Sequence, residues 1–171
     1  MKNDNCFDKI RFEKIKKKYY EDILTLYNYY IIATLVLYET DPLNIRQLIK
    51  KLQLKNKKTK GYTIFYNNIF CGFCLLKPFY PEETNLNIFQ ITMYLKQEYT
   101  GMGIGTIALK YLENIAQNSA IISLIASISS ENHSSIKFFE KNGYIKCGHF
   151  KNMGFKFNRY IDNVYYQKLL F

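Results

Sequence analysis

The 171-residue chain has no tryptophan, three prolines, eight glycines, four cysteines and two histidines. With only two histidines and no second C-x-x-C motif, the sequence offers no ligand set typical of a zinc site. No apolar run reaches the length of a membrane-spanning helix, and the opening MKNDNCFDKIRFEK lacks the apolar core of a signal peptide. We therefore expect a cytoplasmic protein that holds no metal and does not bind a membrane.

The one C-x-x-C, Cys71 and Cys74, lies in IFCGFCLL, a run that predicts a strand. A spacing of three on a strand predicts thiols on opposite faces, where they cannot share a metal. Buried thiols that act as small apolar groups are favoured over a zinc or redox pair.

Apolar residues make up 48% of the chain and aromatic residues 17%, which is typical of a folded protein, and the length favours one domain, residues 1–171. The formal net charge is +10, with lysines concentrated at 14–18 and 50–60. A solvated face and a loop are the simpler interpretation, and attraction of a polyanion is the alternative. Nucleic acid is an unlikely partner on this pattern, because the basic runs are not interleaved with aromatics on one evident surface.

The periodicities predict eleven elements in the order β-α-α-β-β-β-α-β-α-β-β, an α/β domain with a mixed sheet. The second helix is expected to start with Asp41 as N-cap and Pro42 in its first position. A hairpin is expected to turn at Asn67 and Asn68. The predicted ranges are a strand at 6–15, helices at 17–38 and 41–54, a hairpin at 61–76, a strand at 87–95, a helix at 104–118, a strand at 120–129, a helix ending at Gly143, and strands at 144–150 and 163–171 around a loop.

Three alternating glycines, Gly101, Gly103 and Gly105, separate a predicted strand from a predicted helix. In that arrangement, free backbone N–H groups and the helix N-terminus can meet an anion. A P-loop would need Lys-Ser or Lys-Thr after the last glycine, but Thr106 and Ile107 follow it. The next strand, AIISLIASIS, has no acidic residue, which disfavours a dinucleotide fold. The loop therefore predicts a phosphate or pyrophosphate site of another kind.

Two motifs carry a family resemblance. YLKQEYTGMGIGTIALKYL resembles the acetyl-CoA loop of the GNAT superfamily of N-acetyltransferases, and ENHSSIKFFEKNGY is similar to its second signature. Three further segments, VLYETDPLNIRQLIKKL, CGFCLLKPF and MGFKFNRYIDNVYYQKLL, resemble the phosphinothricin acetyltransferase-like branch. The resemblance implies a GNAT fold and acetyl transfer from acetyl-CoA to a primary amine of a small, amino-acid-like substrate. It also implies a homodimer, with Tyr165 and Tyr166 suited to an interface.

The resemblance assigns the cofactor contacts. The backbone of Met93, Tyr94 and Leu95 would pair with the pantetheine arm, and the N–H of Met93 would bind the oxyanion. Asn132 would contact the cofactor further along, although capping its own helix is equally consistent with the sequence. The pyrophosphate contacts would come from Thr100, Gly101, Met102, Gly103, Ile104, Gly105 and Thr106, with Thr100 standing where the family has Arg or Gln.

Two catalytic positions depart from the pattern. Gln90 stands where the branch has a glutamate, and an amide cannot act as a base at neutral pH. Glu39 or the carboxylates at 82–83 are substitutes, and exposed surface carboxylates are the competing interpretation. Phe139 stands where a tyrosine or histidine is expected, which leaves Tyr165, Tyr166 or water as the acid.

The substrate side is expected at Phe79, Lys156, Arg159 and Asp162, where a cation could hold a substrate carboxylate and aromatics could form an apolar wall. Surface charge is an equal alternative for the charged residues. Two other functions remain open: acetylation of a protein N-terminus or lysine, and acyl-CoA binding without catalysis.

Overall fold

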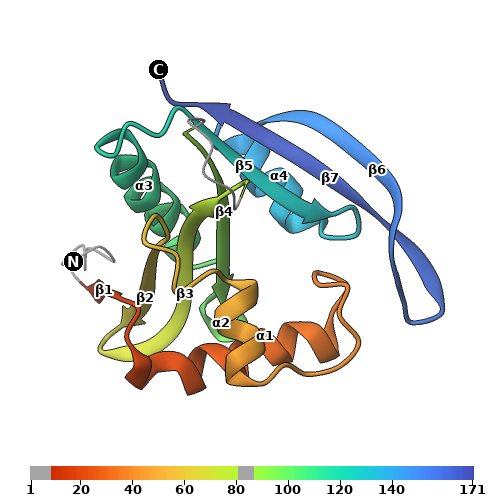
Figure 1. Ribbon diagram of the computed structural model, residues 1–171, viewed down its shortest axis with the longest axis horizontal. Coiled ribbons are helices and arrows are strands. Elements are labelled where there is room, and N and C mark those ends of the chain that lie inside the picture. The colour runs from red at the N-terminus through yellow and green to blue at the C-terminus, as the bar shows by residue number, and fades with distance from the viewer. Residues whose placement is uncertain (1–8, 81–86) are drawn as a thin grey trace, which may run out of the picture.

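The computed structural model describes residues 9–80 and 87–171. They form a seven-stranded sheet in the order β1-β2-β3-β4-β5-β7-β6, and the predicted order of elements is confirmed. The elements are β1 (Ile10–Lys14), η2 (Lys17–Tyr19), α1 (Tyr20–Ala33), α2 (Ile45–Lys51), β2 (Lys60–Tyr66), β3 (Ile69–Pro78), β4 (Ile88–Leu95), η3 (Gln97–Tyr99), α3 (Ile104–Gln117), β5 (Ser123–Ser129), α4 (His133–Lys141), β6 (Ile145–Lys156) and β7 (Arg159–Leu169) (Figure 1).

Helices cover both faces of the sheet. Residues of α1 and α2 such as Ile23 and Leu48 pack with Phe73 and Leu75 of β3 on one face. Residues of α3 and α4 pack on the other face, with Leu109 and Phe139 in that core. Each helix thus buries its apolar side against alternate residues of the strands. No helix in the described part of the chain is long and apolar enough to cross a membrane.

The sheet opens into a fork in its middle. β4 and β5 run parallel and pair only from Ile88–Ser123 to Ile91–Ala126. Beyond that point β4 continues along β3 as far as Leu95, while β5 continues along β7. Figure 1 shows the two strands side by side at one end and diverging toward the other. Among residues 9–80 and 87–171, no strand therefore pairs with the β5 side of β4 after Ile91.

The first two helices differ from their predicted ranges. α1 ends at Ala33 rather than at residue 38, since Thr34 adopts an extended conformation and its Oγ1 donates to the carbonyl of Tyr30 at 2.6 Å. α2 begins after Asn44 and not after Asp41. Asn44 Oδ1 accepts from the N–H of Gln47 at 3.0 Å, and Gln47 Oε1 accepts from the N–H of Asn44 at 2.8 Å. This capping box satisfies two N-terminal donors, which Asp41 cannot do three residues earlier.

The expected loop at 151–162 is mostly strand. β6 and β7 form one long hairpin that turns at Phe157 and Asn158, both with positive φ, at 49° and 59°. The hairpin at Asn67 and Asn68 is confirmed, with φ of 49° and 64°. In Figure 1 the tip of β6–β7 extends away from the rest of the sheet, and we call this hairpin the arm.

Cys71 and Cys74 do not point to opposite faces. The β2–β3 register shifts between Ile64 and Phe65, and Cys71 is left without a partner as a bulge. Both thiols then pack in the core under α3 and α4. Burial raises the pKa of Cys71 to about 11 and raises that of Cys74 further, so both are unreactive thiols, as expected for structural cysteines. No cluster of potential metal ligands occurs among the residues that the structure describes.

The two lysine-rich runs meet on one surface. The N–H of Ile15 donates to the carbonyl of Gly61 at 2.9 Å, which joins the start of the first run to the residue that follows the second. A pocket of about 260 Å³ there is lined by Lys14, Ile15, Tyr20, Leu54, Lys57, Thr59, Lys60, Gly61 and Tyr62. This pocket places lysines of both runs beside two tyrosines, Tyr20 and Tyr62.

Candidate active site

The glycine loop leaves its backbone open to solvent at the start of α3. Gly101 and Gly103 have φ of 75° and 80°, and a Cβ on either would meet no atom of the described part of the chain within 4 Å. Gly103 is the N-cap of α3 and provides no side chain, and the N–H of Ile107 makes a helical bond to Gly103 O at 3.2 Å. The N–H groups of residues 104–106 thus have no intrahelical acceptor. An exposed, uncapped helix start of this kind suits a phosphate anion.

Residues within and beside this loop hold its backbone in place through a hydrogen bond and a packing contact. Thr100 Oγ1 donates to the carbonyl of Gln97 at 2.7 Å, so its hydroxyl proton closes the turn. A Cβ on Gly105 would stand 3.6 Å from the ring of Phe138, which sets the start of α3 against α4. The side chain of Met102 is 40% exposed. Of the predicted contact residues, Gly101, Gly103 and Gly105 can offer a ligand only their backbone.

The open edge of β4 directs alternate residues into the fork. The N–H of Lys96 donates to the carbonyl of Cys71 at 2.8 Å, and the carbonyl of Ile88 accepts from the N–H of Phe79 at 3.0 Å. The backbone N–H and C=O groups of the even-numbered residues of β4 therefore face β3. Because direction alternates along a strand, the N–H and C=O groups of Met93 and Leu95 face the fork. The carbonyl of Leu95 accepts from Tyr30 Oη at 2.7 Å.

Tyr94 differs from its predicted role. Its backbone faces β3, and its ring packs edge-on and tilted against Tyr27, Tyr30 and Phe73. The sequence pattern could not separate it from Met93 and Leu95, because the three are consecutive.

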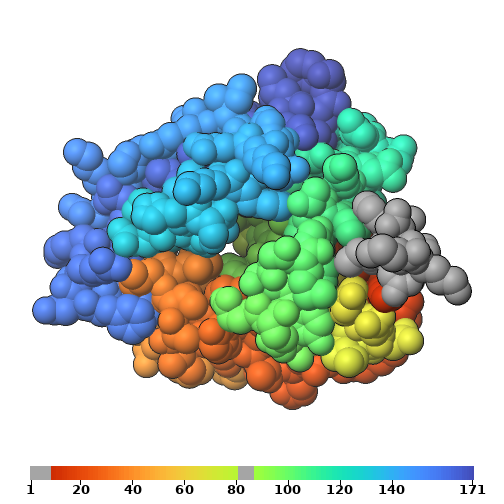
Figure 2. All heavy atoms as spheres, turned by 180° about the vertical axis from the view of Figure 1, so that it is seen from behind, coloured from red at the N-terminus to blue at the C-terminus, as the bar shows by residue number. Residues whose placement is uncertain are grey.

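Asn132 caps α4. Its Oδ1 accepts from the N–H of Ser135 at 3.1 Å and from Ser134 Oγ at 2.9 Å. The cap uses only the amide oxygen, so the capping interpretation is confirmed while the Nδ2 hydrogens are not part of it. In Figure 2 the surface is hollowed between the end of α1, α4 and the segment that leads into α3, the elements that border the fork.

A model of the acetyltransferase (GNAT) family matches residues 22–144. The chain belongs to the GNAT family. It is 22% identical over 149 residues to the phosphinothricin N-acetyltransferase of Streptomyces coelicolor, covering 85% of this chain and 87% of that protein. It is 24% identical over 149 residues to the L-methionine sulfoximine/L-methionine sulfone acetyltransferase of Pseudomonas aeruginosa, covering 85% and 86%.

Solved structures share the fold. An N-acetyltransferase from Staphylococcus aureus Mu50 has a TM-score of 0.86 at 26% identity, covering 95% of this chain and 99% of that one. A GNAT superfamily phosphinothricin acetyltransferase from Sinorhizobium meliloti, in complex with AcCoA, has a TM-score of 0.83 at 20% identity, covering 95% and 89%. The forked sheet is therefore a GNAT sheet, and the motif resemblance is confirmed.

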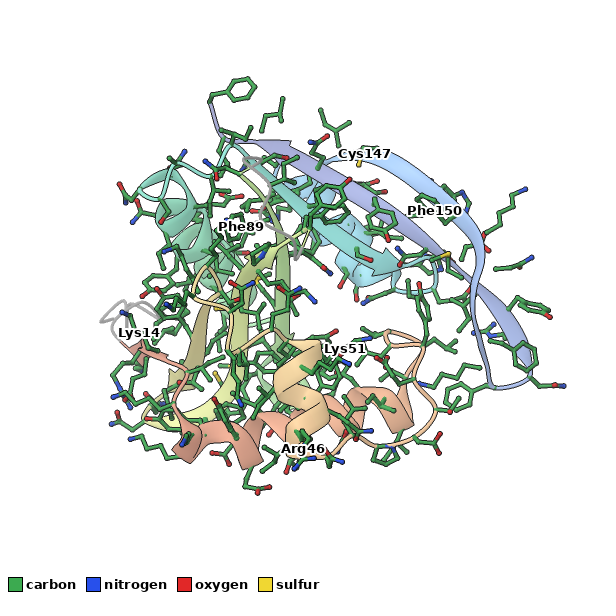
Figure 3. The ribbon with its side chains drawn as sticks, viewed as in Figure 1. Lys14, Arg46, Lys51, Phe89, Cys147 and Phe150 are labelled. Atoms are coloured by element: carbon green, nitrogen blue, oxygen red, sulfur yellow. The ribbon has the colours of Figure 1, made fainter. Side chains whose placement is uncertain are left out.

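The α1–α2 side of this GNAT fork gathers charged residues, and we call it the acceptor face after the role proposed for it below. Phe89 and Ile91 belong to the core under α3, so Gln90 between them points to the acceptor face, opposite Lys77 in the β3–β4 register. Glu39 forms an ion pair with Lys51 at the end of α2. Figure 3 shows Lys51 at the end of α2 nearest the fork.

Electrostatic effects place Glu39 near the acceptor face. Burial raises the pKa of Tyr94, and the charge of Glu39 raises it further. Burial, and to a smaller extent the charge of Lys51, lowers the pKa of Lys77, whereas the charge of Glu39 acts to raise it. The structure thus brings Glu39 to the same face of the sheet as Gln90. The carboxylates at 82–83 lie outside the described residues.

The acid candidates lie mostly in the core. Phe139 packs against Tyr144 with ring centroids 4.9 Å apart. Tyr166 is buried and donates to Glu140 at 2.8 Å, and burial followed by Glu140 raises its pKa to about 12. Tyr165 lies on the opposite face of β7, where its ring meets Phe79 at 6.3 Å. Phe79 and Tyr165 therefore form an aromatic wall, and Tyr166 cannot deliver a proton to the fork.

The predicted substrate cations are already engaged. Lys156 is 4% exposed, and its Nζ donates to the carbonyls of Ile31, Thr34 (2.8 Å) and Leu37 (2.9 Å). Arg159 pairs with Glu131 at 3.1 Å on the surface. All three ammonium donors of Lys156 are used, so it cannot also hold a substrate carboxylate.

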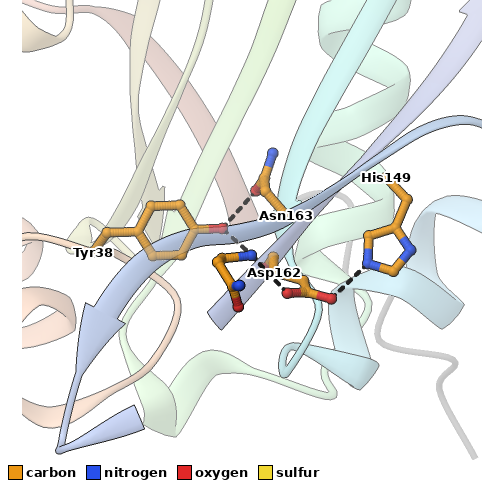
Figure 4. Close-up of polar contacts among 5 residues, drawn as sticks. Tyr38, His149, Asp162 and Asn163 are labelled. Carbon is orange, nitrogen blue, oxygen red and sulfur yellow. Dashed lines mark hydrogen bonds and ion pairs between the residues drawn. The ribbon is translucent and has the colours of Figure 1, made fainter. Parts of the chain in front are cut away.

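Asp162 binds within the arm. Its carboxylate accepts from the N–H of Asn152 at 2.9 Å. It also contacts His149 Nε2 at 2.7 Å, as Figure 4 shows. The bond from Asn152 and then His149 lower the pKa of Asp162. The sequence placed Lys156, Arg159 and Asp162 in a loop by the acceptor site, whereas the structure gives each a partner within the protein.

Proposed function

We propose that the protein transfers the acetyl group of acetyl-CoA to a primary amine of a small, amino-acid-like molecule. The observation that carries the proposal is the β4–β5 fork beside the uncapped start of α3. Acetyl-CoA, when bound, supplies the thioester that the amine attacks. Similarity to enzymes named for phosphinothricin and for methionine sulfoximine supports a small amino-acid-like acceptor.

The residues present fit acetyl-CoA. The N–H groups from the glycine loop to Thr106 would bind the pyrophosphate. The glycines allow this because they have no Cβ to keep the phosphates away from the backbone. The backbone of Met93 and the N–H of Leu95 would bind the pantetheine arm. Asn132 Nδ2, which the cap of α4 does not use, would contact the cofactor further along. The N–H of Met93 donates to the thioester oxygen as that atom gains negative charge.

On the acceptor face, Glu39 takes the proton from the amine, directly or through water, and Gln90 orients the amine by hydrogen bonding. Lys51 and Lys77 carry two positive charges beside this one carboxylate. Such a face suits a substrate that has a carboxylate in addition to its amine. Phe79 with Tyr165 closes its apolar side.

The test follows free thiol while acetyl-CoA is incubated with a panel of amines that includes phosphinothricin and L-methionine sulfoximine. We expect turnover of at least one amine, and Glu39→Gln should lower kcat on the order of 100-fold at neutral pH. Activity of Glu39→Gln should recover at alkaline pH, where the amine arrives neutral. Glu21→Gln, an exposed carboxylate on α1, is the matched control and should match the parent enzyme.

Gln90→Glu distinguishes proton transfer to residue 90 from proton transfer to Glu39. A large gain in rate indicates that this protein has lost a base at residue 90, whereas no gain supports Glu39 as the base. If CoA binds and no amine is acetylated, the protein is an acyl-CoA-binding domain and the proposal fails.

We also propose that the protein is a homodimer. Tyr166, which the sequence suggests for the interface, is only 3% exposed. Tyr160 and Phe157 at the tip of the arm are 67% and 60% exposed, so they suit an interface better. Light scattering of the parent and of Phe157→Ser with Tyr160→Ser tests it. A monomeric parent contradicts the proposal.

A further inference from the structure

Ser127 occupies the branch point of the fork. β4 and β5 last pair at Ile91 and Ala126, so Ser127 is the first residue of β5 beyond the parallel pairing. Its neighbours Ala126 and Ile128 are buried in the core under α3 and α4, so the side chain of Ser127 points to the acceptor face. Ser127 is exposed, although it lies in the middle of a central strand. An accessible hydroxyl therefore stands where the two strands part.

The hydroxyl of Ser127 is oriented by the buried Asn163, which is itself held by the half-buried Tyr38. Its Oγ accepts a hydrogen bond from Asn163 Nδ2 at 2.9 Å, and Asn163 Oδ1 accepts one from Tyr38 Oη at 2.7 Å. Asn163 is 3% exposed, and both ends of its amide are engaged. Figure 4 shows the Tyr38–Asn163 contact. The Tyr38 hydroxyl also meets a second acceptor, the carbonyl of Asp162, at the longer distance of 3.2 Å. Along the shorter contacts the donors run from Tyr38 through Asn163 to Ser127.

This direction determines which way Ser127 donates. Because its oxygen already accepts from Asn163, the hydroxyl proton of Ser127 is free to donate into the fork. Tyr38 stays a donor at neutral pH, since burial raises its pKa to about 12. The arm fixes the ring of Tyr38: a Cβ on Gly154 would lie 2.5 Å from Tyr38 Cδ1, so a glycine is required there.

We propose that Ser127 is a catalytic residue that donates a hydrogen bond to the departing CoA sulfur, with Asn163 and Tyr38 as its positioning residues. The inference rests on the proposed function. The amine nitrogen bonds to the acetyl carbon, the C–S bond breaks, and its electron pair stays on the sulfur. The proton lost by the amine goes to Glu39 or water, the thiolate later takes one from water, and Ser127 keeps its own. The position occupied by the core residue Phe139 then needs no acid.

The first measurement is the pKa of the thiol of bound CoA, determined from the ultraviolet absorbance of the thiolate as pH is raised. A hydrogen bond to the charged form lowers a pKa. We expect the bound thiol of the parent to titrate below that of free CoA, and Ser127→Ala to raise it by about one unit, a tenfold change in the ionisation equilibrium. In turnover, Ser127→Ala should lower kcat by about 10- to 100-fold and leave the KM for acetyl-CoA nearly unchanged.

The chain offers a matched control. Ser123 lies on the same face of β5, and its Oγ accepts from the side-chain amide of Gln167 at 2.8 Å, but it sits where β4 and β5 are still paired. Ser123→Ala should leave the thiol pKa unchanged. Ser127→Thr keeps a hydroxyl on a strand and should retain most of the effect, while Tyr38→Phe should shift the thiol pKa in the same direction by less.

The outcomes are distinct. If the parent binds no CoA, the proposed function fails and this inference with it. If the parent binds CoA and transfers acetyl groups while Ser127→Ala leaves the thiol pKa and kcat as they were, only the role of Ser127 is overturned. An equal shift in Ser123→Ala would also overturn it, because the effect would then not come from the fork.

Discussion

Lys156 is the residue whose substitution we expect to change stability most. Its ammonium is buried at the end of α1 and donates to three carbonyls, of Ile31, Thr34 and Leu37. These carbonyls belong to the last turn of α1 and the segment after it. Thr34 satisfies the carbonyl of Tyr30, and the last turn of α1 has no basic residue, so the arm supplies the cation at this helix end. The perturbation is Lys156→Met, which keeps an unbranched chain of similar length and removes the charge.

Two effects of opposite sign set the magnitude. Burial lowers the pKa of Lys156, so the protein spends free energy in keeping this ammonium out of water. Against that, a hydrogen bond to a charged group contributes about 1.5–3 kcal/mol, and a buried acceptor left unpaired costs about 1–3 kcal/mol. Thr34 and Leu37 are partly accessible and can turn to water, which leaves Ile31 as the main orphan. We expect a net loss of about 3 kcal/mol.

Thermal and urea unfolding followed by circular dichroism measure this loss. In a domain of this size, about 3 kcal/mol corresponds to a fall in Tm of about 6–12 °C. Lys151→Met, at an exposed position on β6, is the control and should change stability by less than about 0.5 kcal/mol. If Lys156→Met is as stable as Lys151→Met, the three hydrogen bonds contribute nothing net and the reasoning is refuted.

Three further changes test other parts of the structure. Asn44→Ala should cost about 1 kcal/mol in urea unfolding and Asp41→Ala almost nothing, because only Asn44 caps α2; the reverse ranking would restore the sequence-based cap. Gly103→Ala should destabilise by about 1 kcal/mol through its φ of 80° and weaken CoA binding in calorimetry by about tenfold, although its Cβ meets no protein atom. Burial raises the pKa of Tyr38 and of Tyr166 to about 12. Since the unfolded chain loses these protons near pH 10, the free energy of unfolding should fall as pH rises from about 10 to 12, and a flat urea midpoint there would contradict the burial.

Local patterns predicted most of the fold. The glycines before α3, the Asn67–Asn68 turn and the Asn132 cap each act over a few residues, and each is where the sequence placed it. The order of elements followed from these local signals. The start of α2 was misplaced because Asp41-Pro42 is also a good start signal, and only the contact between Asn44 and Gln47 decides between them.

The fork itself depends on contacts that are distant in sequence. Nothing in AIISLIASIS indicates that β5 leaves β4 after Ala126, because its later residues pair with Asn163 and its neighbours on β7. Ser127 has no distinguishing motif for the same reason. A serine within an apolar run is the local feature, but Ser123 and Ser129 share it, and only the fold shows that Ser127 is the exposed one.

The arm explains why its residues were mistaken for substrate contacts. Lys156 holds the carbonyls on either side of Val36, and Gly154 gives the ring of Tyr38 its place, so the arm determines where the segment leading to Glu39 runs. From the same arm, Asn163 orients Ser127. A charged or polar residue near an acceptor site need not touch the substrate, and here the contacts run into the protein. The same few residues thereby connect the proposed base on one side of the fork with the proposed donor on the other, which is why a change in the arm should alter kcat without any loss of CoA binding.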